Sequence, residues 1–330
     1  MTRMRALPTP AWIIGHGSVA GPMEGKGPMA KWFDSILSDD TVGEKTYEKS
    51  ELMLFTMAVD QAINSAQLKP GDLDLMCAGD LLNQIISSSF SARGLEIPFL
   101  GLYGACSTMV ESLIVGSMAI ASACADKVLC LSGSHFSTAE RQYRYPLELG
   151  SQRPPTAQRT VTAAGATVLS SVGQGIAVRS FTVGKVIDYG ITDANNMGAA
   201  MAPAAADTIA THLTESGLPL DYYDYVVSGD LGKLGKQLTE EFLLQRGISL
   251  GERYRDCGCD MFYDDQDAHC GASGCGCAAS LLNGYYLKKM SYGQIKRILL
   301  VATGALLSPT SAQQGESIPG VAHAVSIEAE

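Results

Sequence analysis

Two segments of the sequence carry residue types that could do chemistry, and the first surrounds Cys106. An apolar run over Ile97–Leu102 leads into Gly104-Ala105, and a helical apolar pattern follows over Ser107–Ala123. A thiol at a helix N-terminus has its pKa lowered by the helix dipole and by free backbone N–H groups. This spacing predicts Cys106 as a nucleophile, with N–H groups beside it that could hold an oxyanion or a carboxylate. The alternative is a buried structural thiol at a helix cap.

The second segment, Asp267–Cys277, is rich in glycine and opens another helical apolar pattern over Ala272–Met290. It contains His269, a side-chain type that commonly activates a nucleophilic thiol. If the two segments face each other, His269 lies near Cys106 as its base; the alternative is an ordinary loop histidine. We call Gly104–Thr108 the first elbow and Asp267–Cys277 the second elbow.

Cysteines crowd the region of the second elbow and raise the question of a metal site. Their spacing is Cys-x-Cys followed by Cys-x4-Cys-x-Cys, which differs from the Cys-x2-Cys pairs of usual zinc sites. The sequence therefore predicts no metal and no other cofactor. It predicts that the nine cysteines are reduced thiols that act as small hydrophobic residues. The cysteines concerned are Cys257, Cys259, Cys270, Cys275 and Cys277.

The elements that must position the two elbows occur twice in the chain. Asp72–Leu81 and Asp221–Leu231 are apolar runs that both end in Gly-Asp-Leu, as expected of a buried strand followed by a loop. Each is preceded by an alanine-rich helical stretch, Met53–Leu68 or Ala202–Leu218. The paired positions, offset by 150 residues, include Asp74 and Asp224, Gly79 and Gly229, and Asp80 and Asp230.

A second pair of segments extends the repeat. Lys127–Gly133 and Arg297–Gly304 each place a basic residue before an apolar strand that ends in glycine. Near-continuous apolar strands that alternate with helices are typical of parallel α/β proteins, whose sheets are covered on both faces. The sequence therefore predicts an α/β fold of two duplicated halves, residues 1–180 and 181–330, related by a pseudo-twofold axis.

The composition excludes several classes of protein. The chain has 330 residues, of which 46% are hydrophobic, and a formal net charge of −10. This apolar content excludes a disordered chain, and the acidic charge without a basic stripe argues against nucleic-acid binding. The longest apolar run, Ser112–Ala125, is shorter than the roughly 20 residues of a spanning helix. Met1–Ser18 lacks the apolar core of a signal peptide. We expect neither a transmembrane segment nor a signal peptide.

Both elbows resemble motifs of the thiolase and ketoacyl-synthase superfamily. Gly104-Ala-Cys106-Ser resembles its nucleophile elbow. His269–Gly274 resembles its Gly-His-Pro-x-Gly-Ala-Ser-Gly motif, shortened by one residue and without the proline. The resemblance implies a thiolase-like fold with duplicated five-layered α-β-α-β-α architecture. It also implies a homodimer with the segment His135–Glu148 at its interface.

Within this superfamily the sequence resembles the stage V sporulation protein AD family. The resemblance implies a protein that binds dipicolinic acid, alone or as its calcium chelate, for uptake into the developing spore. It implies membrane-embedded partner proteins of the same operon and a peripheral position at the spore inner membrane. The segments that carry the resemblance are Ala78–Gln84, Gly104–Thr108, Thr138–Pro146, Asp188–Asp193, Met201–Ile209 and Val301–Pro309.

The sequence departs from thiolases where their acid–base residues are expected. The loop after the second-half strand is Ser228–Lys233, in place of a His-Gln-Ala-Asn-like or Asn-Glu-Ala-Phe-like segment. Ala302 stands where thiolases carry a second catalytic cysteine. Because carbon–carbon bond formation needs these groups, we expect a binding protein without Claisen-type catalysis. The alternative is an acyl-transfer or condensing enzyme that uses Cys106.

A dianion such as dipicolinate needs local donors, because the overall field of an acidic chain repels it. The helix N-termini at the two elbows and one lysine could supply them. Calcium that enters with the ligand would bind oxygen atoms such as those of Asp80, Asp230 or Asn83, although we favour loop hydrogen bonding for both aspartates. The predicted ligand-binding residues are Cys106, Ser107, Thr108, His269, Gly271, Ser273 and Lys26.

Overall fold

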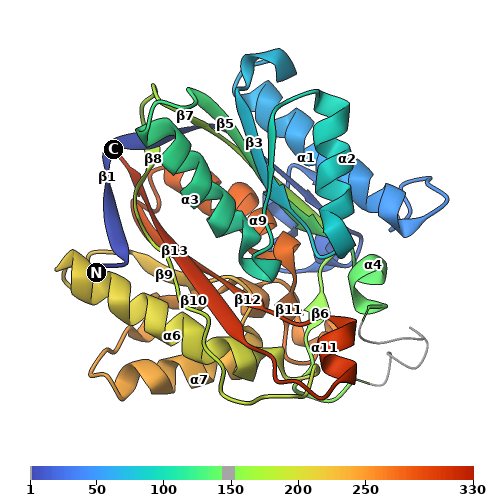
Figure 1. Ribbon diagram of the computed structural model, residues 1–330, viewed down its shortest axis with the longest axis vertical. Coiled ribbons are helices and arrows are strands. Elements are labelled where there is room, and N and C mark those ends of the chain that lie inside the picture. Colours follow the sequence, from blue (N-terminus) through green and yellow to red (C-terminus); the bar gives the residue numbers. More distant parts are fainter. Residues whose placement is uncertain (1, 143–152) are drawn as a thin grey trace.

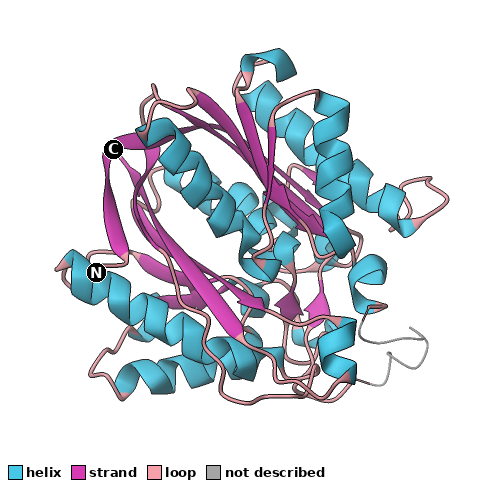
Figure 2. Ribbon diagram, viewed as in Figure 1, coloured by secondary structure: helices cyan, strands magenta, loops and turns pink. Residues whose placement is uncertain are grey.

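The computed structural model describes residues 2–142 and 153–330, and the described residues build a large mixed sheet (Figures 1 and 2). The first-half strands lie in the order β4-β3-β5-β7-β1, and the second-half strands lie in the order β10-β9-β12-β13-β8. In the first half the bounds are β1 Met4–Ala20, β3 Leu75–Gly79, β4 Phe99–Gly101, β5 Lys127–Ser134 and β7 Ala163–Ser170. In the second half they are β8 Ile176–Thr182, β9 Tyr225–Ser228, β10 Tyr254–Asp256, β12 Arg297–Ala305 and β13 Gly320–Ala329.

The two halves repeat the same pairing. In each, the first three strands are parallel, and the fourth and fifth are antiparallel to their neighbours. The fifth strands of the halves, β1 and β8, pair antiparallel, with Met4 opposite Thr182, and this pairing makes the strands of both halves continuous. We call the first-half and second-half parts of this continuous sheet the two sheets. The predicted duplicated α/β fold is therefore confirmed. The predicted boundary between residues 180 and 181 falls within β8 and stays a prediction.

Helices fill three layers around the two sheets (Figure 1). One outer layer holds α1 (Tyr47–Ser65), which packs on β1 and β7, with α2 (Ile86–Leu95) beside it. The other outer layer holds α6 (Met197–Ser216), which packs on β12 and β13, with α7 (Gly232–Leu244) beside it. The layer between the sheets holds α3 (Thr108–Ala121) and α9 (Cys275–Leu281). The five-layered order agrees with the predicted architecture.

The central helices are apolar on most sides because α3 contacts strands of both sheets. Met109 and Leu113 of α3 are fully buried. Helix α9 comes so close to β7 that side chains do not fit at the contact: a Cβ on Gly165 would lie 2.2 Å from the carbonyl oxygen of Ala279. Glycine at this position lets the elbow helix reach the centre of the molecule.

The second central helix begins three residues later than the sequence predicts. Ala272–Ser273 form a short strand, β11, which pairs with β6 (Arg159–Thr160), and the helix starts at Cys275. Gly274, with φ of 105°, turns the chain from strand to helix. Beyond α9 the helix widens into a π-helical turn, Leu282–Tyr286. The remaining elements include β2 Ser35–Ile36, η1 Glu24–Lys26, η2 Ala30–Trp32, η5 Ala105–Ser107, α4 Phe136–Glu140, α8 Cys257–Asp260, α10 Leu287–Ser291 and α11 Pro309–Gln313.

The repeated aspartates before the strands play the same part in each half. The Asp74 carboxylate accepts hydrogen bonds from the backbone N–H groups of Asp126 and Lys127, each at 2.9 Å. The Asp224 carboxylate accepts from the N–H groups just before and at the start of β12, at 2.6 and 2.9 Å. These bonds tie the start of β3 to β5 and that of β9 to β12. In the part of the chain that the structure describes, no helix combines the length and apolarity needed to cross a bilayer.

Candidate functional site

The first elbow brings Cys106 to the wall of a cavity. The chain leaves β4, enters the 3-10 turn η5 and continues as α3, and Ala105 adopts a φ of 50° just before the cysteine. The Cys106 side chain is 8% exposed, and that small exposed part faces the cavity. The sequence therefore placed this thiol correctly, at a strand-to-helix turn that lines a hollow.

The Cys106 thiol has hydrogen-bond partners in the Asp230 carboxylate, from the loop after β9, and the backbone N–H of Gly274. Asp230 is buried and also accepts from Thr303 Oγ1 at 2.7 Å and from the Gly274 N–H at 3.0 Å. This carboxylate thus connects the first elbow, the second elbow and β12. The predicted pairing of Cys106 with His269 is not what the structure shows.

Burial controls the proton positions in this network. Burial raises the pKa of the Asp230 carboxyl to about 7, against the lowering effect of its hydrogen bonds. Burial, followed by the nearby Asp230 charge, raises the pKa of the Cys106 thiol well above its usual range. The direction is opposite to the lowered pKa that the helix-terminus argument predicts, because that argument leaves out desolvation and a neighbouring carboxylate. At neutral pH the thiol therefore stays protonated and donates to Asp230.

The cavity lies where the ends of several elements meet. Its volume is about 430 Å³, which is within the range of small-molecule sites. Polar groups from Tyr103, Gln142, Thr160 and Ser273 line it beside Cys106. The other residues that line it are Asp80, Leu81, Leu82, Ile85, Ala105, Ala139, Met197, Gly274, Ala305, Leu306, Leu307, Ser308, Pro309 and Ser311. None of the chain's five histidines is in this lining, and no lysine or arginine of residues 2–142 and 153–330 is.

Asp80, the counterpart of Asp230, is the carboxylate in the cavity wall. Its Oδ1 accepts from the Leu82 N–H at 2.9 Å, and its Oδ2 accepts from the N–H and hydroxyl of Ser88 at 2.8 and 2.7 Å. Burial raises its pKa above the usual range. Loop hydrogen bonding, the role favoured for Asp80 and Asp230 from the sequence, is what both side chains do. Asn83, the third suggested calcium ligand, is exposed and does not line the cavity.

Among the predicted ligand-binding residues at the elbows, Ser273 joins Cys106 in the cavity wall. Ser107 and Thr108 are buried and donate their hydroxyls to the carbonyl oxygens of Gly104 and Ala105, each at 2.6 Å. Their hydroxyls are therefore used by the backbone of the turn that leads into α3, and neither residue lines the cavity.

The other three predicted residues lie outside the cavity lining. Gly271 has a φ of 111°, and its carbonyl oxygen accepts from the Arg159 N–H at 2.9 Å. His269 Nε2 lies 3.3 Å from Asp267 Oδ1 within the second elbow. Lys26 is exposed in η1. Their contribution to ligand binding stays a prediction.

Sequence reasoning missed two parts of the site. One is the segment from Ala305 to Ser311, which follows β12 and carries no ionisable group, so a search for reactive residues passed over it. The other is the Asp230–Cys106 contact, for which the Gly-Asp-Leu repeat was the available signal. No group of three or more histidine, cysteine or acidic side chains in the described residues could hold a metal ion, and all nine cysteines are free thiols.

A buried, protonated thiol should react slowly with alkylating agents. We expect iodoacetamide at pH 8 to modify Cys106 at least about ten times more slowly than the exposed Cys124, because the thiolate is the reacting species. Peptide mass spectrometry over a time course measures both rates in the same sample. Equal rates, or a faster rate at Cys106, would show a reactive thiolate and contradict the proton assignment.

The raised pKa of Asp230 predicts a pH-dependent stability difference. The folded carboxyl holds its proton up to about pH 7, whereas the unfolded one loses it near pH 4, so wild-type stability falls as pH rises through this window. The asparagine side chain of Asp230→Asn does not titrate, so this variant lacks that pH dependence. We expect the unfolding free energy of wild type relative to Asp230→Asn to fall between pH 5 and 7, by at most about 1.4 kcal/mol per pH unit. Urea titrations measure it, and a constant or rising difference would refute the raised pKa.

The comparisons with known proteins agree with this geometry. The family model described as Stage V sporulation protein AD (SpoVAD) matches residues 2–328. A relative, the stage V sporulation protein AD of Bacillus subtilis (strain 168), is 43% identical over 319 residues, which cover 97% of this chain and 94% of that protein.

Solved structures show the fold. The 3-oxoacyl-[acyl-carrier-protein] synthase III of Aquifex aeolicus VF5 is 15% identical with a TM-score of 0.61, and 96% of this chain and 99% of that chain are covered. Human mitochondrial 3-ketoacyl-CoA thiolase is 14% identical with a TM-score of 0.62, and 98% of this chain and 99% of that chain are covered. The architecture is thus thiolase-like, and the chain belongs to the stage V sporulation protein AD family of sporulation proteins.

Proposed function

We propose that this protein binds dipicolinic acid, alone or as its calcium chelate, in the cavity between the two elbows. In this proposal it serves uptake into the developing spore, at the spore inner membrane and with membrane-embedded proteins of the same operon. The observation that carries the proposal is a small-molecule cavity lined by Cys106, whose thiol donates to Asp230 behind the wall, with no histidine of the described residues in the lining. Membership in a sporulation family supports the biological setting.

The charge of the lining favours the chelate. Asp80 is in the wall, and no cationic side chain of the described residues is. A free dianion would therefore enter an acidic protein without a compensating charge. A chelate of one calcium ion and one dipicolinate is neutral, and its metal can share carboxylate, amide and hydroxyl oxygens. Gln142, Ser273 and Tyr103 offer polar groups that a planar ligand with two carboxylates could use.

Titration calorimetry of the folded protein tests this proposal. We expect one binding site per chain, with calcium dipicolinate bound more tightly than dipicolinate in the presence of a calcium chelator. Pyridine-2-carboxylate, which lacks one carboxylate, should bind more weakly than either. No heat with any of them at millimolar concentration, while circular dichroism shows folded protein, would contradict the proposal.

The second candidate is acyl transfer through Cys106, and the fold of the solved relatives is the observation that favours it. Incubation with acetyl-CoA followed by intact-mass measurement separates the two. We expect no adduct on wild type beyond that on Cys106→Ala. A stable acyl adduct that disappears in Cys106→Ala would favour the enzyme.

The proposed homodimer has a candidate surface at the edge of the first-half sheet. Strand β4 is the end strand there, and such edges tend to pair with another chain. Leu100 on β4 is 48% exposed, and the nearby helix α2 exposes Phe90. The predicted interface segment His135–Glu148 lies partly outside the described residues, which stop at residue 142 and resume at residue 153.

A further inference from the structure

A group of aromatic and lysine side chains gathers outside both elbows. It consists of Trp32 from η2, Tyr285 from the π-helical turn, Tyr292 after α10, and the lysines Lys31 and Lys289; we call it the Trp32 patch. Trp32 stacks edge-on against Tyr285 with ring centres 5.3 Å apart, and Tyr292 lies 6.5 Å away. The Nζ atoms of Lys31 and Lys289 lie 5.6 and 5.0 Å from the Trp32 ring centre.

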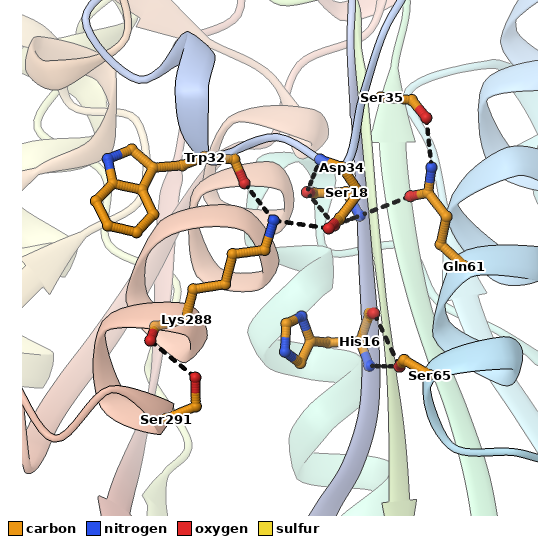
Figure 3. A network of polar contacts seen from close by, with 9 residues as sticks. All are labelled: His16, Ser18, Trp32, Asp34, Ser35, Gln61, Ser65, Lys288 and Ser291. Atoms are coloured by element: carbon orange, nitrogen blue, oxygen red, sulfur yellow. Dashed lines mark hydrogen bonds and ion pairs between the residues drawn. The ribbon is translucent and has the colours of Figure 1, made fainter.

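The backbone of Trp32 is held by a polar network behind the patch (Figure 3). Lys288 Nζ donates to the Trp32 carbonyl oxygen and to Asp34 Oδ1, both at 2.6 Å. Asp34 Oδ2 in turn accepts from the N–H and hydroxyl of Ser18 on β1, at 2.9 and 2.7 Å. Figure 3 shows the indole pointing away from Asp34 and Ser18. The network therefore holds Trp32 on a fixed scaffold, where its side chain, like those of Tyr285 and Lys289, is half-buried.

The charge around the patch is opposite to that of the whole protein. Lys288 is neutralised by Asp34, but neither Lys31 nor Lys289 forms an ion pair with a described carboxylate. Arg255 lies 5.6 Å from the Tyr225 ring centre, and both Arg255 and the largely buried Asp260 act electrostatically on Tyr285, so this pair adds no net charge to the patch. The patch is thus locally cationic, although the chain carries a net charge of −10.

We propose that the Trp32 patch binds the surface of a membrane that contains anionic lipids. Tryptophan and tyrosine rings favour the boundary between headgroups and acyl chains, and lysines beside them attract anionic headgroups. The patch joins three such rings to these two lysines on one rigid surface, and Tyr292 is 65% exposed. This inference rests on the proposed function, since it supplies the contact by which the protein meets the membrane.

Vesicle sedimentation tests the patch. The probes are vesicles of phosphatidylglycerol and phosphatidylcholine in equal parts, and vesicles of phosphatidylcholine alone, both at low salt. We expect wild type to bind the anionic vesicles and the neutral ones only weakly. Lys31→Gln with Lys289→Gln should lower the partition coefficient on anionic vesicles about 25-fold, since each lysine near such a surface contributes about fivefold.

The matched control is Lys45→Gln with Lys49→Gln, which makes the same charge change at two exposed lysines near the start of α1. We expect it to stay within twofold of wild type. An equal loss in both pairs would mean that overall charge governs binding and would overturn the patch. If wild type bound neither kind of lipid vesicle, the patch would be overturned as well, even if the protein bound vesicles that carry membrane proteins.

Tryptophan fluorescence gives a second readout. The chain has two tryptophans, so Trp12→Phe leaves Trp32 as the only one. Its emission should shift to shorter wavelength on anionic vesicles and be quenched by brominated lipid; an unchanged spectrum on bound protein would place the contact elsewhere. Both lysine variants should keep the calorimetric dipicolinate binding of wild type. A lack of vesicle binding contradicts the patch, whereas a lack of dipicolinate binding contradicts the proposed function, so the two failures give different results.

Discussion

Replacing Asp230 with alanine should lower the free energy of unfolding by about 2–4 kcal/mol at pH 6, because buried donors lose their common acceptor. The Thr303 hydroxyl, the Gly274 N–H and the Cys106 thiol all donate to this one carboxyl group. Each unsatisfied buried donor costs about 1–3 kcal/mol, offset in part by the desolvation that the carboxyl no longer suffers. Urea denaturation followed by circular dichroism measures the loss.

Two variants serve as controls for this prediction. Asp230→Asn keeps the shape and one acceptor oxygen, so it should lose about half as much. Asp221→Ala removes an exposed carboxylate close in sequence and should change the free energy of unfolding by less than about 0.5 kcal/mol. If Asp230→Ala were as stable as Asp221→Ala, the carboxylate would not hold the two elbows together.

Filling the cavity should abolish ligand binding. Ser273, which is buried, lines the cavity beside Gly274, and the exposed Ser308 lines it from the start of α11. A tryptophan at either position occupies space that the ligand needs, so we expect Ser273→Trp and Ser308→Trp each to weaken calcium dipicolinate binding at least about 20-fold by calorimetry. That factor corresponds to about 1.8 kcal/mol of binding free energy.

The matched control places the same side chain elsewhere. Ser122 lies at the exposed C-terminal end of α3, and Ser122→Trp should bind calcium dipicolinate as tightly as wild type does. Ser308→Trp is the decisive variant, because Ser308 is exposed: losing its hydroxyl, which caps α11 by accepting from the Ser311 N–H at 3.1 Å, costs only about 1 kcal/mol of stability. If Ser308→Trp and Ser273→Trp, each with a wild-type melting temperature, bound the ligand normally, the ligand would have to lie outside this cavity.

The fold is predictable from the sequence because its strands are buried on both faces. Such strands appear as apolar runs, and the chain contains them twice with matching aspartates, so the duplication can be recognised from the order of residues alone. The start of α9 is not predictable to the residue. Ala272 and Ser273 fit a helical pattern, but Gly274 turns the chain, and pairing with Arg159 and Thr160 makes them a strand.

The site is predictable only in its general location. Cys106 and Ser273 line the cavity because both lie at strand-to-helix junctions, which the sequence pattern marks. His269 is not in the cavity lining: Asp267 and His269 both adopt a positive φ, 54° and 51°, and the histidine lies against Asp267, so its predicted part in ligand binding stays a prediction. The state of the Cys106 thiol depends on Asp230, 124 positions later, and no local pattern encodes such a contact.

A crystal structure of this protein grown with calcium dipicolinate tests the central claim most directly. The proposal predicts ligand density in the cavity of about 430 Å³, within hydrogen-bond distance of Ser273 or Gln142, with the Cys106 thiol unmodified and still donating to Asp230. An empty cavity with the ligand bound elsewhere, or a covalent adduct on Cys106, would contradict it.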